Sequence, residues 1–123
     1  MGWDINLILS DGEIAQVKPH QTGSNRRAAL NEDGQLITID HDEASCCVTY
    51  NYSEVYRLVG FHMKDINGKT GKETIPILEQ SIEKLGTKSY DDYWAPTPGN
   101  AGIALVSLLN WAKEHPDGIW KVT

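Results

Sequence analysis

Two different spacings of apolar residues divide the sequence into a strand-rich first part and a helix-rich second part. Before residue 50 apolar positions alternate with polar ones, and this two-residue period is typical of β-strands. The pattern predicts strands over residues 3–9, 14–18, 35–40 and 44–50, with turns at residues 10–13 and 31–34. We expect the first two strands to form a β-hairpin that Pro19 ends, followed by a polar loop over residues 20–30 and, later, an acidic bend at residues 40–43.

After Tyr52 the spacing becomes that of α-helices. Ser53 can cap a short helix that continues to about Val59, where Gly60 closes it. The next apolar stripe predicts a helix over about residues 74–85, closed by Gly86.

The start of that second helix has two readings. Thr70 and Glu73 have the spacing of a capping box, which would begin the helix at Thr70. Pro76 would then fall in the helix interior, where it removes a hydrogen bond. The pattern therefore favours a loose first turn before the regular helix.

The longest apolar segment, residues 97–115, predicts a third helix. Thr97 suits the capping position and Pro98 the first helical position, and a His-Pro-Asp-Gly turn follows. Residues 101–112 are apolar on nearly all sides, which is typical of a buried, central helix. The sequence also allows a strand over residues 119–122. We expect one α+β domain over residues 1–123, with antiparallel hairpins first and three helices after them.

The charge of the chain is concentrated in its first part. The formal net charge is −6, of which residues 1–49 contribute −5 and residues 50–123 only −1. An acidic face can simply keep a domain in solution, or it can meet a basic partner surface. Direct binding of nucleic acid is disfavoured, because Arg26 and Arg27 stand nearly alone and form no basic stripe.

The cysteines and the N-terminus point to a cytosol. Cys46 and Cys47 are neighbours on a predicted strand and point to opposite faces, so a disulfide between them is not expected. Reduced cysteines and the lack of a signal peptide favour a cytosolic protein. No segment is long and apolar enough to predict a membrane span.

A set of short motifs resembles a family of small uncharacterised proteins of bacteriophages and prophages. In chain order these are Thr-Tyr-Asn-Tyr-Ser at residue 49, Gly-Lys-Thr-Gly-x-Glu-x-Ile-Pro-x-Leu-Glu at residue 68, Asp-Asp-Tyr-Trp-Ala-Pro-Thr-Pro-Gly-Asn-Ala-Gly at residue 91, and His-Pro-Asp-Gly-Ile-Trp at residue 115. The resemblance covers about residues 49–122. It implies a phage or prophage origin and a bacterial cytosol, and it brings no activity or catalytic residue.

The chemical motifs argue against an enzyme. Gly68-Lys69-Thr70 lacks the glycine-rich loop of a phosphate-binding motif. The cluster around His41 is explained as well by an exposed acidic bend, so neither a metal nor another cofactor is expected. No nucleophile elbow is present, and the cysteines fall in a predicted buried strand. Asp91 and Asp92 could act as an acid–base pair, but adjacent loop acids are more often solvated.

An aromatic loop before the third helix is the most informative site candidate. Its side chains could anchor a protein partner, because rigid aromatic residues give contact area at low entropy cost. They could equally cover the core of a small domain. The loop residues concerned are Tyr90, Asp91, Asp92, Tyr93 and Trp94.

The sequence favours a non-catalytic phage-encoded binding protein that engages a host protein, as an inhibitor of a defence or nucleic-acid-processing complex. Its expected contact residues are the aromatic loop together with Glu32, Asp33, Asp40, Asp42 and Glu43. One alternative is a small-molecule binder, for a nucleotide or signalling molecule, in which Arg26, Arg27 and Lys69 converge. A second alternative is a structural or self-assembling accessory protein.

Overall fold

The computed structural model describes residues 2–20, 27–30, 32–39, 41–88 and 95–123. Antiparallel strands come first, three helices follow, and a strand ends the chain, which confirms the predicted α+β class. The strands are β1 (Gly2–Ile8), β2 (Gln16–His20), β3 (Arg27–Leu30), β4 (Leu36–Ile39), β5 (His41–Glu43), β6 (Ser45–Thr49) and β7 (Ile119–Val122). The helices are α1 (Ser53–Leu58), α2 (Gly71–Leu85) and α3 (Pro98–Glu114), with 3₁₀ turns at Tyr50–Tyr52 and Met63–Ile66.

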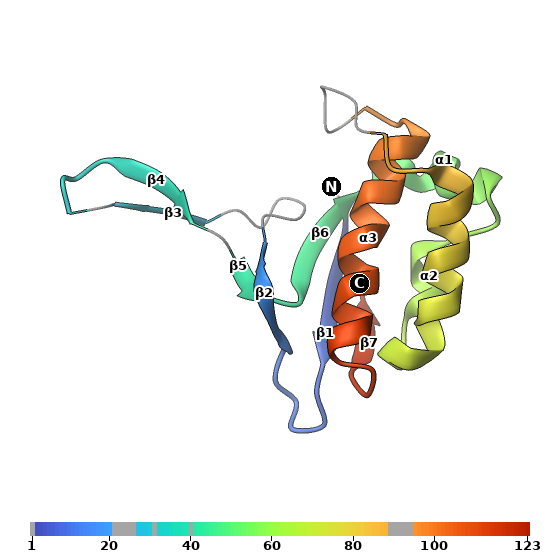
Figure 1. Cartoon of the computed structure of the whole chain (residues 1–123), viewed down its shortest axis with the longest axis horizontal. Coiled ribbons are helices and arrows are strands. Elements are labelled where there is room, and N and C mark those ends of the chain that lie inside the picture. Colours follow the sequence, from blue (N-terminus) through green and yellow to red (C-terminus); the bar gives the residue numbers. More distant parts are fainter. Residues whose placement is uncertain (1, 21–26, 31, 40, 89–94) are drawn as a thin grey trace.

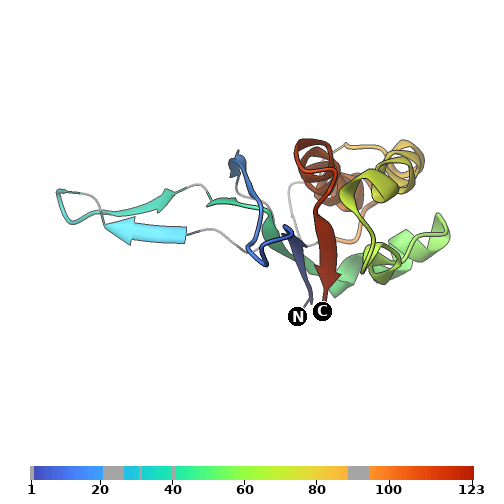
Figure 2. The same cartoon turned by 90° about the horizontal axis from the view of Figure 1, so that it is seen from below.

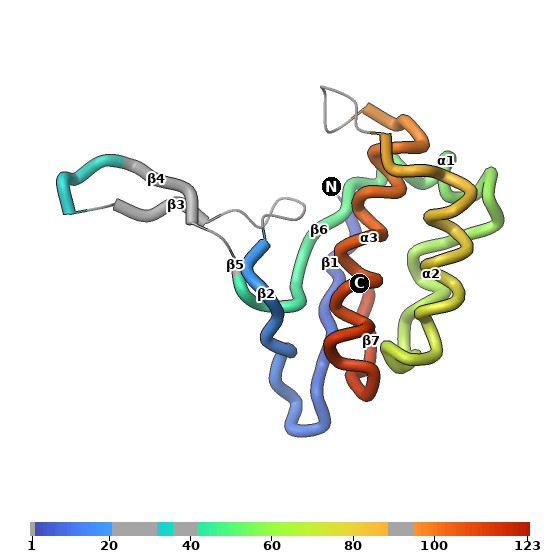
Figure 3. The backbone as a smooth tube through the Cα atoms, in the orientation of Figure 1, coloured from blue at the N-terminus to red at the C-terminus, as the bar shows by residue number. Residues whose placement is uncertain are grey.

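A three-stranded antiparallel sheet in the order β6-β1-β7 forms the base of the fold (Figures 1 and 3). Along β1, Trp3, Ile5 and Leu7 are buried, while Asp4 between them is exposed. This alternation is the predicted two-residue period, and it directs one face of the sheet to the core. The strand predicted over residues 119–122 is present as β7 and pairs with the second half of β1.

Helix α3 lies across the inner face of this sheet, and α2 packs beside α3 (Figure 2). The buried side of α3 includes Ala104, Leu105, Leu108 and Trp111, which join the sheet residues in one apolar core. The outer side is only half-buried and Asn110 is exposed. The prediction of a central, core-forming third helix is thus confirmed.

The start of α2 corrects the sequence prediction. The helix begins at Gly71, and Thr70 and Glu73 form the complete capping box: the Thr70 hydroxyl accepts from the Glu73 N–H at 3.2 Å, and the Glu73 carboxylate accepts from the Thr70 N–H at 3.2 Å. Pro76 is inside the helix. Its cost is a single lost backbone bond near the first turn, and the two capping bonds offset that loss.

The first hairpin also differs from the prediction. The segment before β2 makes an isolated bridge with β1, between Ile14 and Ile8. Strand β2 itself pairs with β5 and runs on through Pro19 to His20. The reason is that β6 and β7 already occupy both edges of β1. The predicted acidic bend is therefore partly strand β5.

A second two-stranded ribbon, β3–β4, stands away from the sheet and helices (Figures 1 and 2). We call it the arm. Its register pairs Arg27 with Ile39 and Leu30 with Leu36, and residues 32–35 form the turn at its far end. Strand β3 falls in the segment that the sequence pattern predicts as a polar loop, because the alternation is too short there to indicate a strand.

Candidate interaction surfaces

The predicted aromatic anchor falls in a part of the chain that the structure leaves undescribed. Asp40 and the loop residues Tyr90, Asp91, Asp92, Tyr93 and Trp94 all lie outside the described residues. Of the predicted site residues, the structure therefore describes only the remaining acidic ones, which are Glu32, Asp33, Asp42 and Glu43.

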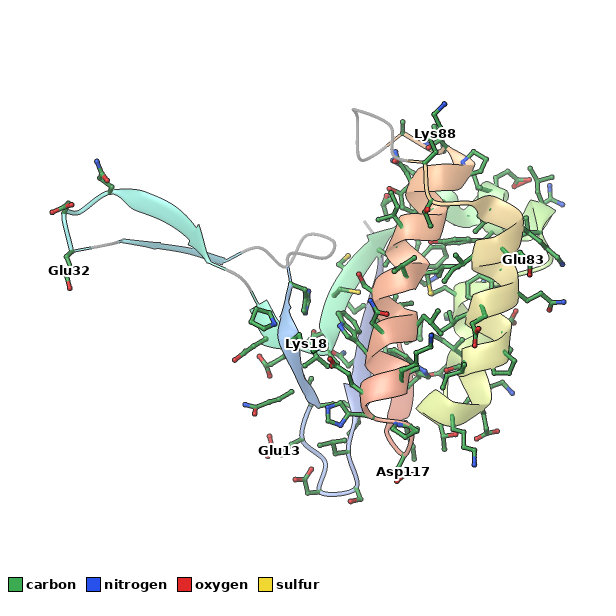
Figure 4. All side chains as sticks on the ribbon, viewed as in Figure 1. Glu13, Lys18, Glu32, Glu83, Lys88 and Asp117 are labelled. Atoms are coloured by element: carbon green, nitrogen blue, oxygen red, sulfur yellow. The ribbon has the colours of Figure 1, made fainter. Side chains whose placement is uncertain are left out.

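These four acidic residues do not form one patch. Glu32 and Asp33 are exposed in the turn at the far end of the arm, whereas Asp42 and Glu43 lie on β5, beside the body of the fold. Figure 4 shows Glu32 far from Glu13, the labelled acid next to the body strands. The structure thus divides the predicted acidic surface into an arm tip and a body portion.

The body portion forms part of a groove of about 460 Å³ beside the start of β2. We call it the acidic groove. Three carboxylate residues line it, from the β1–β2 turn and from β5, and the groove also includes a histidine. The lining residues are Leu9, Asp11, Glu13, Ile14, Gln16, Glu43 and His115.

Asp11 and Glu13 are the members that the sequence prediction leaves out. Both are exposed, and the Asp11 carboxylate accepts a 2.9 Å bond from the Glu13 N–H, which fixes the turn. The only signal for them in the sequence is the acidic turn of residues 10–13. That turn could be linked to Glu43 only once β2 was known to pair with β5.

Two histidines hold the β2–β5 ribbon against α3. The Nε2–H of His115 donates to the carbonyl of Gln16 at 2.5 Å, and the Nε2–H of His20 donates to the carbonyl of Glu43 at 2.7 Å. Because a carbonyl can only accept, both rings carry a proton on Nε2. The ring of His20 also packs on that of Trp111, with centroids 4.8 Å apart. These contacts hold β2 against α3 and join β5 to β2.

A second groove, of about 390 Å³, lies between the ribbon and α3. We call it the basic groove. It carries two exposed lysines at its edge and Trp111 beneath, and its lining residues are Lys18, Pro19, His20, Ser107, Asn110, Trp111, Lys113 and Glu114. Neither Lys18 nor Lys113 makes an ion pair within the described part of the chain. The sequence gave no indication of this groove, because its two sides are about ninety positions apart.

The approach to α3 is tightly packed on its described side. The Thr97 hydroxyl caps the helix by accepting from the Asn100 N–H at 3.2 Å, as predicted, and Asn100 is buried. A Cβ on Gly99 would lie 1.7 Å from the Lys88 carbonyl oxygen, and one on Gly102 would lie 1.9 Å from the Gly86 carbonyl oxygen. The two glycines therefore let the segment after α2 cross directly over the helix.

The aromatic residues near the strand–helix junction serve mainly as packing. Tyr52 is buried, and the buried Tyr56 hydroxyl donates to the Ala101 carbonyl at 3.0 Å. Tyr50 is 44% exposed and meets Trp3 edge to face at 4.9 Å. Trp111 and Trp120 are both buried.

The thiol of Cys46 and the possible metal ligands can be placed among the described residues. Burial raises the pKa of the Cys46 thiol far above its ordinary value, with further contributions from Cys47 and Asp4, so the thiolate is suppressed. No group of three or more possible metal ligands is found in this part of the chain. Lys69 lies beside β7, whereas Arg26 and the side chain of Arg27 lie outside what the structure describes.

Comparison with protein-family models, with curated proteins and with solved structures finds no match for this chain. Among the described residues, none of the helices is both long and apolar enough to cross a membrane.

Proposed function

We propose that this chain is a non-catalytic, phage-encoded binding protein that acts in the bacterial cytosol on a host protein. The partner that we infer is a defence or nucleic-acid-processing complex, which the chain inhibits. The phage origin rests on the motif resemblance described above, and the binding role rests on the surface of the body.

The acidic groove is the observation that carries this proposal. Asp11, Glu13 and Glu43 line one concave surface, and the exposed Asp42 is adjacent to it. A surface with three carboxylates in a groove favours a basic partner and speeds its approach at low salt. Surfaces that bind DNA or RNA are basic, so an acidic protein can occupy them in place of nucleic acid.

The position of the groove on the ribbon supports a recognition role. The His115–Gln16 bond and the packing of His20 on Trp111 fix β2 on α3, and the His20–Glu43 bond joins β5 to β2, so the carboxylates are presented by a held strand pair and a short turn. A fixed arrangement of charges loses less entropy on binding than a mobile one.

The experiment that tests the proposal begins with a tagged chain used to capture partners from a bacterial host, identified by proteomics. The binding of the purified partner is then measured by titration calorimetry at several salt concentrations. The variant Glu13→Lys/Glu43→Lys should weaken binding by roughly tenfold or more and flatten its salt dependence.

The matched control is Glu79→Lys/Glu83→Lys, which makes the same charge change on the exposed side of α2. It should leave the affinity nearly unchanged. Equal affinities of the groove variant, the control and the unmodified chain for the partner would contradict the acidic-groove proposal. A small ligand retained by the purified protein in native mass spectrometry would instead favour the small-molecule alternative.

A further inference from the structure

Three isoleucines lie side by side on the outer face of the sheet, the face turned away from α2 and α3 (Figure 2). Ile8, at the end of β1, lies directly opposite Ile119 of β7 on one side and directly opposite Ile14 on the other. Residues opposite each other in antiparallel segments have Cβ atoms about 4.5–5.5 Å apart on the same face. We call these three side chains the isoleucine row.

The row points away from the core. Leu7, Ala15 and Trp120, which are the sequence neighbours of its three members, are buried, and successive residues of a strand point to opposite faces. Ile119 is 49% exposed, and the other two isoleucines are half-buried. In the described part of the chain, none of the three is among the side chains that pack on the apolar core. An outer sheet face in contact with water usually carries polar residues, so adjacent isoleucines there indicate a surface that another molecule covers.

The row is continuous with the acidic groove. Ile14 belongs to both, because it also lines the groove, and the exposed carboxylates of Asp11 and Glu13 lie in the turn that leads to it. At the other end of the row, Asp117 and Lys121 are both exposed and lie two positions before and after Ile119. One acid and one base balance each other there. The excess negative charge is therefore at the Ile14 end.

We propose that the isoleucine row and the acidic groove together bind one partner segment, which carries apolar residues followed by basic residues. The apolar side chains cover Ile119 and Ile8, and the basic side chains reach Asp11 and Glu13 beyond Ile14. The inference rests on the proposed function and adds the chemistry of the partner. Apolar contact supplies affinity that salt does not screen, whereas the charges speed the approach of the segment and fix its direction.

The dimensions of the row suit a short segment. Neighbouring strands lie about 4.8 Å apart, so the three isoleucines span about 10 Å. An extended chain advances about 3.3 Å per residue, and its alternate side chains point to the same face. Two apolar residues at alternate positions thus cover most of the row, and the residues that follow them enter the groove.

The test measures the binding of two fluorescein-labelled heptapeptides by fluorescence anisotropy at low salt. The first peptide is Val-Ser-Val-Ser-Lys-Ser-Lys, which has two apolar residues followed by two basic ones. The second has serine in place of both valines and therefore the same charge. The unmodified chain should bind the valine peptide roughly tenfold more tightly than the serine peptide, because only the valine peptide covers the row.

Two variants separate the row from the groove. Ile119→Thr keeps a β-branched side chain in the strand and should weaken the valine peptide roughly fivefold or more, with little effect on the serine peptide. Glu13→Lys/Glu43→Lys should weaken both peptides and flatten their salt dependence. Leu58→Gln, which removes an exposed aliphatic side chain from α1, is the matched control and should change neither affinity. Circular dichroism should show the same fold for every variant.

The outcomes distinguish this inference from the proposed function. If the groove variant weakens both peptides but Ile119→Thr weakens neither, the row takes no part in binding and the inference fails, while the acidic groove stands. If the groove variant changes neither affinity, the acidic groove fails and the inference fails with it. Self-association of the unmodified chain in light scattering, abolished by Ile119→Thr, would show that a second copy covers the row and would also overturn the inference.

Discussion

The indole N–H of Trp120 donates a 2.8 Å hydrogen bond to the hydroxyl of Thr74, and both side chains are almost fully buried. The Thr74 hydroxyl donates in turn to the Gly71 carbonyl at 2.8 Å. Strand β7 is therefore joined to the first turn of α2 by a chain of two bonds with every proton used. Buried networks of this kind are stable only when each member has a partner.

Thr74→Val tests these two hydrogen bonds, because valine keeps the shape of the side chain and removes the hydroxyl that accepts from Trp120. The Trp120 N–H is then buried without a partner, which costs about 1–3 kcal/mol in the free energy of unfolding. Urea denaturation followed by tryptophan fluorescence measures the change. Thr74→Ser retains the hydroxyl and should lose less, and Thr87→Val, at an exposed position, should be close to neutral. A stability of Thr74→Val equal to that of the unmodified chain would contradict the role of the bond.

Gly102→Ala tests the crossing of the segment after α2 over α3. The added Cβ would lie 1.9 Å from the Gly86 carbonyl oxygen, a backbone atom that cannot rotate away. The expected loss of unfolding free energy is about 1–3 kcal/mol, measured by thermal or urea denaturation. Asn110→Ala, on the exposed side of the same helix, should be neutral or slightly stabilising. If both substitutions behave alike, the close crossing does not exist in solution.

The capping box of α2 should contribute to stability in a pH-dependent way. Hydrogen bonds from the backbone N–H and the hydroxyl of Thr70 lower the pKa of the Glu73 carboxyl below its ordinary value of 4.5. A carboxyl whose pKa is lower in the folded state stabilises the fold above about pH 4.5. This contribution is lost as the pH falls through the lowered value.

Glu73→Gln removes this titration and keeps an oxygen acceptor for the cap. Its free energy of unfolding, measured from neutral to acidic pH, should fall less steeply below pH 4.5 than that of the unmodified chain. Glu79→Gln, on the exposed side of the same helix, should follow the unmodified chain. Identical acid dependence in all three proteins would show that the cap bonds do not hold the carboxylate.

The two adjacent cysteines should differ in reactivity. Cys46 is buried with a raised pKa, whereas Cys47 is half-buried on the other side of β6. Native alkylation followed by mass spectrometry should label Cys47 first and Cys46 roughly a thousandfold more slowly, because Cys46 becomes accessible only on unfolding. Cys47→Ser should abolish the fast phase. Equal labelling rates would contradict the burial of Cys46.

Local signals in the sequence were sufficient for the helices. Thr97 and Pro98 mark the start of α3, and Gly86, with φ of +75°, ends α2 in the backbone conformation that favours glycine. The start of α2 shows the limit of single-residue rules, because the capping bonds of Thr70 outweigh the penalty of Pro76. Two opposing local effects can be ranked only when their energies are compared.

Strand pairing could not be predicted in the same way. The alternation predicts that β1 is half-buried, but it does not say that β6 and β7 are its neighbours. For the same reason the sequence does not show how the predicted acidic residues are distributed: Glu32 lies at the far end of the arm, whereas Glu43 lies on β5 beside the body. Asp11 and Glu13 were missed because their link to Glu43 depends on the pairing of β2 with β5.

The central position of β1 also sets the order in which the fold can be completed. Leu7 pairs with Trp120, so the sheet lacks one edge until β7 has been synthesised and has reached β1. Contacts between distant parts of a chain slow folding, because a long loop must close before they stabilise anything. During synthesis the apolar side chains of β1 and α3 therefore remain partly uncovered until β7 pairs with β1.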